Sequence, residues 1–190
     1  MISTHQADQI LLRFAGVADE HAQRFLERLR QLRRLGVPSG VPKGRGVASG
    51  RTFEQMIEAA LAIRLLQAGL TSTAAADLVS RAWPLARSVL ILFDPELNSA
   101  EWPEGPPTNL YWVMEPEGLA DYRDRSEAAQ PRLTTFMLFR GQRLEEALKT
   151  WPGRSGSSII LVEGREMVTS LMAAFAAEEV EPPDLEVLSY

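Results

Sequence analysis

Apolar residues recur at helical spacing through the first 84 residues, and glycine or proline separates the recurring groups. The first group predicts a helix from about Thr4 to Phe14, ended by Gly16. A second helix is predicted over about residues 20–35, with Asp19 as its N-cap and Gly36 just past its end. Its apolar positions form one stripe: Ala22, Phe25, Leu26, Leu29 and Leu32.

Two further helices follow a glycine-rich stretch. Thr52 and Gln55 have the spacing of a capping box, and the helix they begin is expected to run to about Ala68, before Gly69. Thr71 is the expected cap of a fourth helix, which Trp83-Pro84 should close because proline cannot continue a helix.

The second half has a different pattern, with short β-prone segments. They are Ser88–Phe93, Asn109–Met114, Leu133–Phe139, Ser157–Val162 and a last one near Asp184–Leu188. Helices are predicted over Leu144–Trp151 and Arg165–Glu178. The sequence therefore predicts an α+β fold in two domains, a mostly helical one over 1–84 and a small α+β sheet domain over 85–190.

Charge is divided unevenly between these two domains. Residues 1–84 hold eleven lysines and arginines against seven acids, whereas the remainder carries nine against eighteen, so a net charge of +4 is followed by one of −9. Between Arg24 and Arg51 the balance is eight basic residues to one acid. Such an asymmetry indicates nucleic-acid contact by the first domain.

The basic residues coincide with a particular order of elements. An arginine-rich helix comes first, residues 36–51 with five glycines and two prolines predict an extended hairpin, and a helix pair follows. This is the order of a winged helix-turn-helix domain. In such a domain one helix reads base edges in the major groove of DNA, and the hairpin, called the wing, contacts the DNA backbone. Arginine suits both tasks because its planar fork bonds a guanine edge or a phosphate.

Residues 24–82 resemble the DNA-binding domain of MerR-type regulators. The resemblance lies in Leu29-Arg30-Gln31-Leu32-Arg33-Arg34-Leu35-Gly36, in Gly44-Arg45-Gly46 with Arg51-Thr52-Phe53, and in Ile63-Arg64-Leu65-Leu66-Gln67-Ala68-Gly69-Leu70-Thr71. It implies a winged-helix transcriptional regulator that binds double-stranded DNA. The family's long dimerisation helix has no counterpart here, because Trp83-Pro84 and a predicted strand follow instead, so its dimer geometry is not implied.

The DNA contacts expected from this arrangement fall into two groups. Base edges are assigned to His21, Gln23, Arg24 and Arg28. Phosphates are assigned to Arg30, Arg34, Lys43, Arg45 and Arg51. The acidic second domain is expected to form a homodimer, or to bind a protein partner or a small ligand, and like-charge repulsion would keep it off DNA.

The composition of the chain excludes several other classes of function. The absence of cysteine excludes disulfides, thiolate zinc sites and cysteine nucleophiles, and there are only two histidines. The longest apolar runs are far short of a membrane span, and no basic-then-apolar leader begins the chain, so a cytoplasmic protein is expected. We expect no enzymatic activity, no cofactor and no metal.

Two alternatives to a DNA-binding regulator remain open. The arginine face could be a solvated surface or could bind a protein, as in an accessory factor of a phage or mobile element. A metal-dependent enzyme would instead use Asp94, Glu115 and Glu163, which each follow a predicted strand.

A ligand pocket could be lined by four aromatic residues of the second half: Trp102, Tyr111, Trp112 and Trp151. Core packing is the commoner role of such residues.

Overall fold

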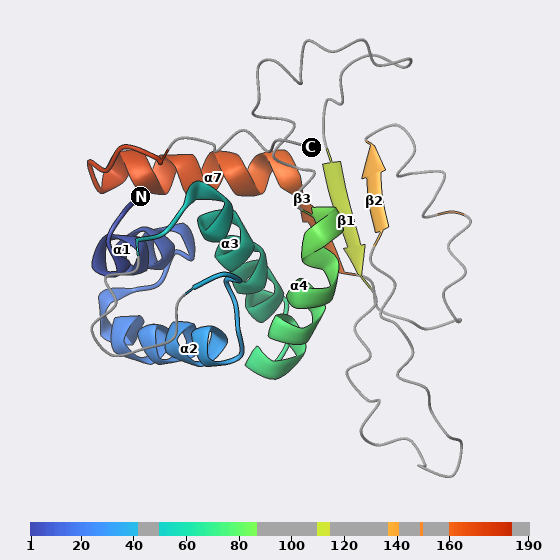
Figure 1. The fold of residues 1–190 in the computed structure, drawn as a ribbon, viewed down its shortest axis with the longest axis horizontal. Helices are drawn as coiled ribbons and strands as arrows, with labels where there is room; N and C mark the ends of the chain where they lie inside the picture. Colours follow the sequence, from blue (N-terminus) through green and yellow to red (C-terminus); the bar gives the residue numbers. More distant parts are fainter. Residues whose placement is uncertain (42–49, 87–109, 115–136, 141–148, 150–159, 184–190) are drawn as a thin grey trace.

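A computed structural model describes residues 1–41, 50–86, 110–114, 137–140, 149 and 160–183. These residues form an α+β fold, in which helices make one body and a small sheet adjoins it (Figure 1). The helices are α1 (Thr4–Phe14), the 3-10 turn η1 (Asp19–His21), α2 (Ala22–Arg34), α3 (Phe53–Gln67), α4 (Ser72–Ala86) and α7 (Gly164–Ala177). The strands are β1 (Leu110–Met114), β2 (Met137–Arg140) and β3 (Ile160–Glu163).

Local sequence signals fix most of the helix starts. A capping box of Ser3 and Gln6 begins α1, and the predicted box of Thr52 and Gln55 begins α3. Thr71 Oγ1 accepts a hydrogen bond from Ala74 N–H at 3.2 Å, which confirms its predicted place before α4. The prediction for Asp19 is wrong, because this residue lies inside η1, and α2 begins after His21 without a side-chain cap.

Glycines follow the ends of α1, α2 and α3, whereas α4 and α7 end without one. Gly36 and Gly69 have φ of 96° and 95°, a left-handed conformation that ends a helix at low cost only in glycine. After α2, Val37 N–H bonds to Leu32 O and Gly36 N–H to Arg33 O, which is a Schellman motif. The prediction that Trp83-Pro84 closes the fourth helix is wrong, since Pro84 lies inside α4. Only two helical residues follow it, so the lost backbone bond falls in the last turn.

The three strands form an antiparallel sheet in the order β2-β1-β3. Trp112 in the central strand pairs with Leu138 on one side and Val162 on the other. Part of each predicted strand over 109–114, 133–139 and 157–162 is therefore a strand. The strands predicted at 88–93 and 184–188 lie outside the described residues, as does nearly all of the helix predicted at 144–151.

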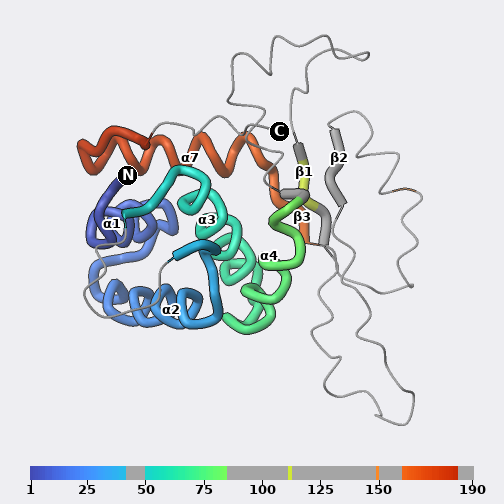
Figure 2. Tube along the Cα trace, viewed as in Figure 1, coloured from blue at the N-terminus to red at the C-terminus, as the bar shows by residue number. Residues whose placement is uncertain are grey.

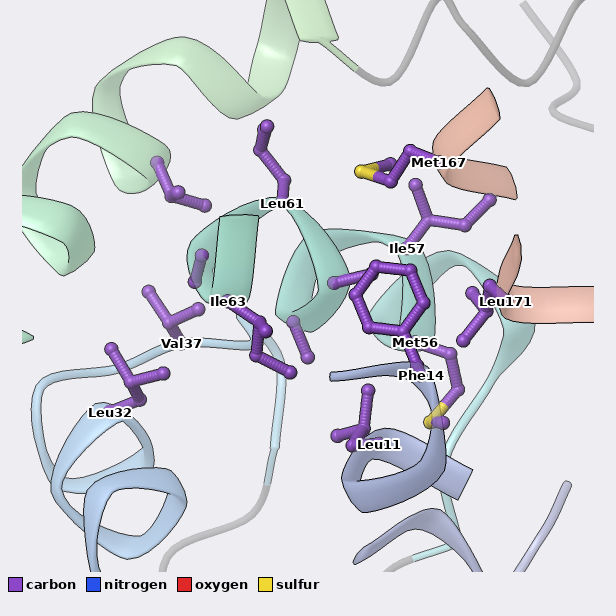
Figure 3. Packing of buried hydrophobic residues seen from close by; sticks show 14 of the residues in the cluster. Leu11, Phe14, Leu32, Val37, Met56, Ile57, Leu61, Ile63, Met167 and Leu171 are labelled. Atoms are coloured by element: carbon purple, nitrogen blue, oxygen red, sulfur yellow. The ribbon is translucent and has the colours of Figure 1, made fainter. Parts of the chain in front are cut away.

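One hydrophobic core joins the two predicted domains. α7, confirmed close to its predicted range, runs along α1 and α3 (Figures 1 and 2). Figure 3 shows Leu32 and Val37 on one side of α3, and Met167 and Leu171 of α7 on the other. All four belong to one buried cluster that also contains Trp112 and Val162 of the sheet. In the described part of the chain, residue 84 therefore does not separate two cores.

Among the described residues, no helix is both long and apolar enough to cross a bilayer.

Candidate nucleic-acid interface

The outward face of α2 is polar along its whole length. Leu29 and Leu32 are buried beneath it, and Phe25 and Leu26 pack against the same core at its sides. The exposed positions are Gln23, Arg24, Glu27, Arg28, Arg30, Gln31 and Arg34. α2 lies at the edge of the helical body, next to α1 and α4 (Figure 1). A four-residue turn, 15–18, with Gly16 at φ 64°, follows α1 and is followed by η1 and α2.

The arginines on this face differ in their partners from most other arginines that the structure describes. Arg24, Arg28, Arg30 and Arg34 form no ion pair or hydrogen bond through their side chains with any part of the chain that the structure describes. Elsewhere, arginines pair with acids: Arg13 with Glu178, Arg33 with Asp8, Arg64 with Glu166 and Arg81 with Asp77. Four guanidinium groups therefore stand on one helix face with their donors open to an external acceptor.

Arg33 belongs to α2 but not to this face. Its Nη2 donates to Asp8 Oδ1 of α1 at 2.7 Å, and its Nε donates to the Leu29 carbonyl at 3.3 Å. Both charged side chains are 20% exposed. The pair therefore ties α2 to α1 and removes one of the five arginines of the helix from its outward face.

Arg51 is also directed inward, which removes it from the predicted phosphate contacts. It is 5% exposed, and a guanidinium enclosed to that extent cannot reach a phosphate in this conformation. Its backbone forms an antiparallel bridge with Ile2, with N–H to O distances of 3.1 and 2.8 Å. Burial lowers the pKa of the Arg51 guanidinium, and nearby Arg33 lowers it further, whereas Asp8 raises it.

The remaining predicted contacts have three different positions. His21, in η1 just before α2, is exposed, and its Nε2 lies 3.4 Å from Glu20 Oε1. Gln23 and Arg24 occupy the exposed first turn of α2. Lys43 and Arg45 lie outside the described residues.

The segment leaving α2 is held by two side chains of α3. Ser39 donates from its N–H and its Oγ to Glu58 Oε2, both at 2.8 Å. The Ser39 carbonyl accepts from Gln55 Nε2 at 2.9 Å. Together with the bridge of Arg51 to Ile2, these bonds fix the chain before and after residues 42–49, the part of the predicted hairpin over 36–51 that lies outside the described residues.

Glu58 is a buried carboxyl in this clamp. Its side chain is 1% exposed, and its Oε1 has no hydrogen-bond partner among the described residues. Burial raises the pKa of Glu58, the two bonds from Ser39 lower it, and Glu54 adds a smaller upward shift. The sequence offered no signal for this role, because an acid four residues after Glu54 reads as an exposed helix position.

A cavity of about 20 Å³ lies where α1, α2 and the start of α3 meet. Asp8, Arg33 and Arg51 form its polar wall, and apolar residues including Leu11 and Met56 form the rest. This volume suits about one water molecule and not an organic ligand.

The described residues of the second half give little support to a metal-dependent active site or to a pocket lined by aromatic residues. Glu163 ends β3, whereas Asp94 and Glu115 lie outside the described residues. No cluster of three or more metal-ligating side chains occurs in the ranges that the structure describes. Trp112 is fully buried in the core, Tyr111 is half-buried, and Trp102 and Trp151 fall outside these ranges.

Comparison with protein-family models and with curated proteins finds no match to this chain.

Proposed function

We propose that this chain is a transcriptional regulator that binds double-stranded DNA through the outward face of α2. The observation that carries the proposal is the set of four exposed arginines that have no side-chain partner among the described residues: Arg24, Arg28, Arg30 and Arg34. An unpaired guanidinium on a surface is ready to bond a phosphate or a guanine edge bidentately. The contrast with the paired arginines of α1, α3 and α4 argues against a face that is merely solvated.

The placement of α2 supports the same function. It follows α1 along the chain, and would serve as the second helix of a helix-turn-helix pair, the position from which a helix enters the major groove. Its N-terminal residues His21, Gln23, Arg24 and Arg28 would face base edges, and Arg30 and Arg34 would face phosphates. Lys43 and Arg45 would add phosphate contacts from the wing, as in the MerR-type regulators that residues 24–82 resemble.

The acidic second half would serve assembly or regulation. A single short reading helix gives limited specificity, so regulators commonly pair two half-sites through a dimer. We propose a homodimer for this reason, with a protein partner or a small ligand acting through residues 85–190.

The test is fluorescence anisotropy with mixed-sequence duplex DNA at about 50 and about 200 mM salt. Each phosphate contact releases counterions, so the affinity of the wild type should fall steeply over this range. The double variant Arg24→Ala/Arg28→Ala should bind more weakly than the wild type at both salt concentrations.

A matched control removes the same charge elsewhere. Arg13 and Arg81 are exposed arginines of α1 and α4, each already paired with an acid. Arg13→Ala/Arg81→Ala should bind nearly as well as the wild type. Equal losses in both double variants would show that only net charge matters, and absence of binding at the lower salt would refute the function.

A further inference from the structure

The exposed positions of α2, together with its C-cap residue Leu35, form two rows along the helix. Spacings of four, three and four residues place Arg24, Arg28, Gln31 and Leu35 in one row. The same spacings place Gln23, Glu27, Arg30 and Arg34 in the other. The other side of the helix, with Leu29 and Leu32, is buried in the core. We call the row that begins with Arg24 the acid-free row, and the row that begins with Gln23 the mixed row.

The two rows differ in charge and in chemistry. The acid-free row has two arginines and no acid, whereas the mixed row has Glu27 in its second position. A carboxylate is repelled by the phosphates that flank the major groove. The acid-free row can therefore enter the groove with less electrostatic repulsion than the mixed row. Its last member, Leu35, is a large apolar side chain that remains 41% exposed.

We propose that the acid-free row reads the DNA sequence, with Gln31 selecting adenine and Leu35 contacting a thymine methyl group. The proposal rests on the DNA-binding function above and extends it to two exposed residues, Gln31 and Leu35. Gln31 forms no side-chain hydrogen bond within the described residues, and its amide can bond adenine N6 and N7 at once. Arg24 and Arg28 would take guanine N7 and O6 in the same row.

The length of the row fits a short recognition site. A helix rises 1.5 Å per residue, so Arg24 and Gln31 stand about 10 Å apart along the axis. Base pairs are stacked about 3.4 Å apart and the groove is inclined to the DNA axis, so these two side chains would reach bases at most about three steps apart. The preferred site should therefore combine guanines with an adenine or thymine within about three base pairs.

The experiment begins with selection of preferred duplexes from a randomised pool by the full chain. The affinities of the wild type, Gln31→Ala and Gln31→Arg are then measured on the selected site and on its single-base variants. Gln31→Ala should lose about tenfold or more of the discrimination at one adenine. Gln31→Arg should prefer guanine at that position, and Leu35→Ala should lose preference at a thymine.

Glu27→Ala is the control, since it removes an exposed side chain with no assigned DNA contact from the mixed row of the same helix. It should leave the preferred site unchanged. The salt dependence of Gln31→Ala should equal that of the wild type because no charge is removed. This readout separates loss of base reading from general loss of binding.

Other outcomes overturn the proposal in distinguishable ways. A site changed by Glu27→Ala but not by Gln31→Ala would move base reading to the mixed row. Wild-type binding without any base preference would refute the reading row and leave DNA binding standing. Failure of the wild type to bind any duplex at low salt would remove the proposed function itself.

Discussion

Arg33 Nη2 lies 2.7 Å from Asp8 Oδ1, and this bond gives Arg33 a role opposite to that of the next residue, Arg34. Arg33 joins α2 to α1, whereas Arg34 is exposed without an internal partner among the described residues. Two identical side chains that are adjacent in the sequence are thus divided between an internal ion pair and the exposed surface. The division can be tested by experiment.

Replacing the two arginines should separate these roles. Arg33→Ala leaves the half-buried carboxylate of Asp8 without its partner and should lower the free energy of unfolding by about 1–3 kcal/mol. Arg34→Ala removes an exposed side chain and should change it by less than about 0.5 kcal/mol. Urea denaturation measures both. On DNA, Arg34→Ala should lower the slope of log affinity against log salt by about one.

Asp8→Asn tests the same ion pair from α1. The amide keeps an acceptor oxygen but loses the charge, so we expect a loss of about 1 kcal/mol in the free energy of unfolding. Asp77→Asn is the control, because Asp77 pairs with Arg81 at a similar distance of 2.8 Å but at an exposed site. Exposed pairs contribute little, so this variant should be nearly neutral. Equal losses would contradict a special role for the pair between α1 and α2.

Burial of Glu58 predicts a pH-dependent stability. Its pKa in the folded chain is raised above the ordinary value of 4.5, so the folded state holds this proton more tightly than the unfolded state. The contribution of Glu58 to the free energy of unfolding therefore falls as pH rises from 4.5 through the raised pKa. Glu58→Gln has no such dependence. The stability of this variant minus that of the wild type should increase with pH.

Urea denaturation from about pH 4 to about pH 8 measures this difference, within the range in which carboxyl titration alters stability. Glu20→Gln, which removes the same charge at an exposed position, provides the baseline. A difference for Glu58→Gln that decreases with pH would mean that the bonds from Ser39 outweigh burial.

The shared core predicts that α7 unfolds together with the N-terminal helices. Phe175 is 1% exposed, and its ring lies 6.1 Å from that of Phe53 between centroids. Phe175→Ala should cost about 3–5 kcal/mol and shift the unfolding of the whole helical body in one transition. Met172→Ala, in the same helix at 39% exposure, should cost far less. A transition of α7 alone, monitored by hydrogen exchange, would indicate an independent second domain.

Local sequence was sufficient for most helix boundaries. The capping box of Thr52 and Gln55 and the helix end at Gly36 depend on residues within a few positions of one another. The apolar stripe of α2 also depended only on periodicity, and Leu29 and Leu32 are buried as predicted. The helix boundaries predicted at Asp19 and Pro84 were wrong by a few residues. A short 3-10 turn precedes α2 and a proline lies in the last turn of α4, and local sequence signals do not define helix ends that closely.

The candidate interface required more than local signals. The arginine-rich face of α2 was predicted from composition, but periodicity could not tell that Arg33 meets Asp8, 25 residues away. Nor could it tell that Arg51 turns inward beside Ile2, or that Glu58 holds Ser39.

The sequence by itself determined the helices, their polar and apolar faces and the concentration of positive charge in the first half, because these depend on neighbouring residues and on counting. Only the tertiary structure decided which arginines remain open to a partner and that α7 shares the core of the N-terminal helices. Those outcomes depend on which acids and apolar faces meet after the chain has folded, and contacts between distant residues leave no periodic trace in the sequence.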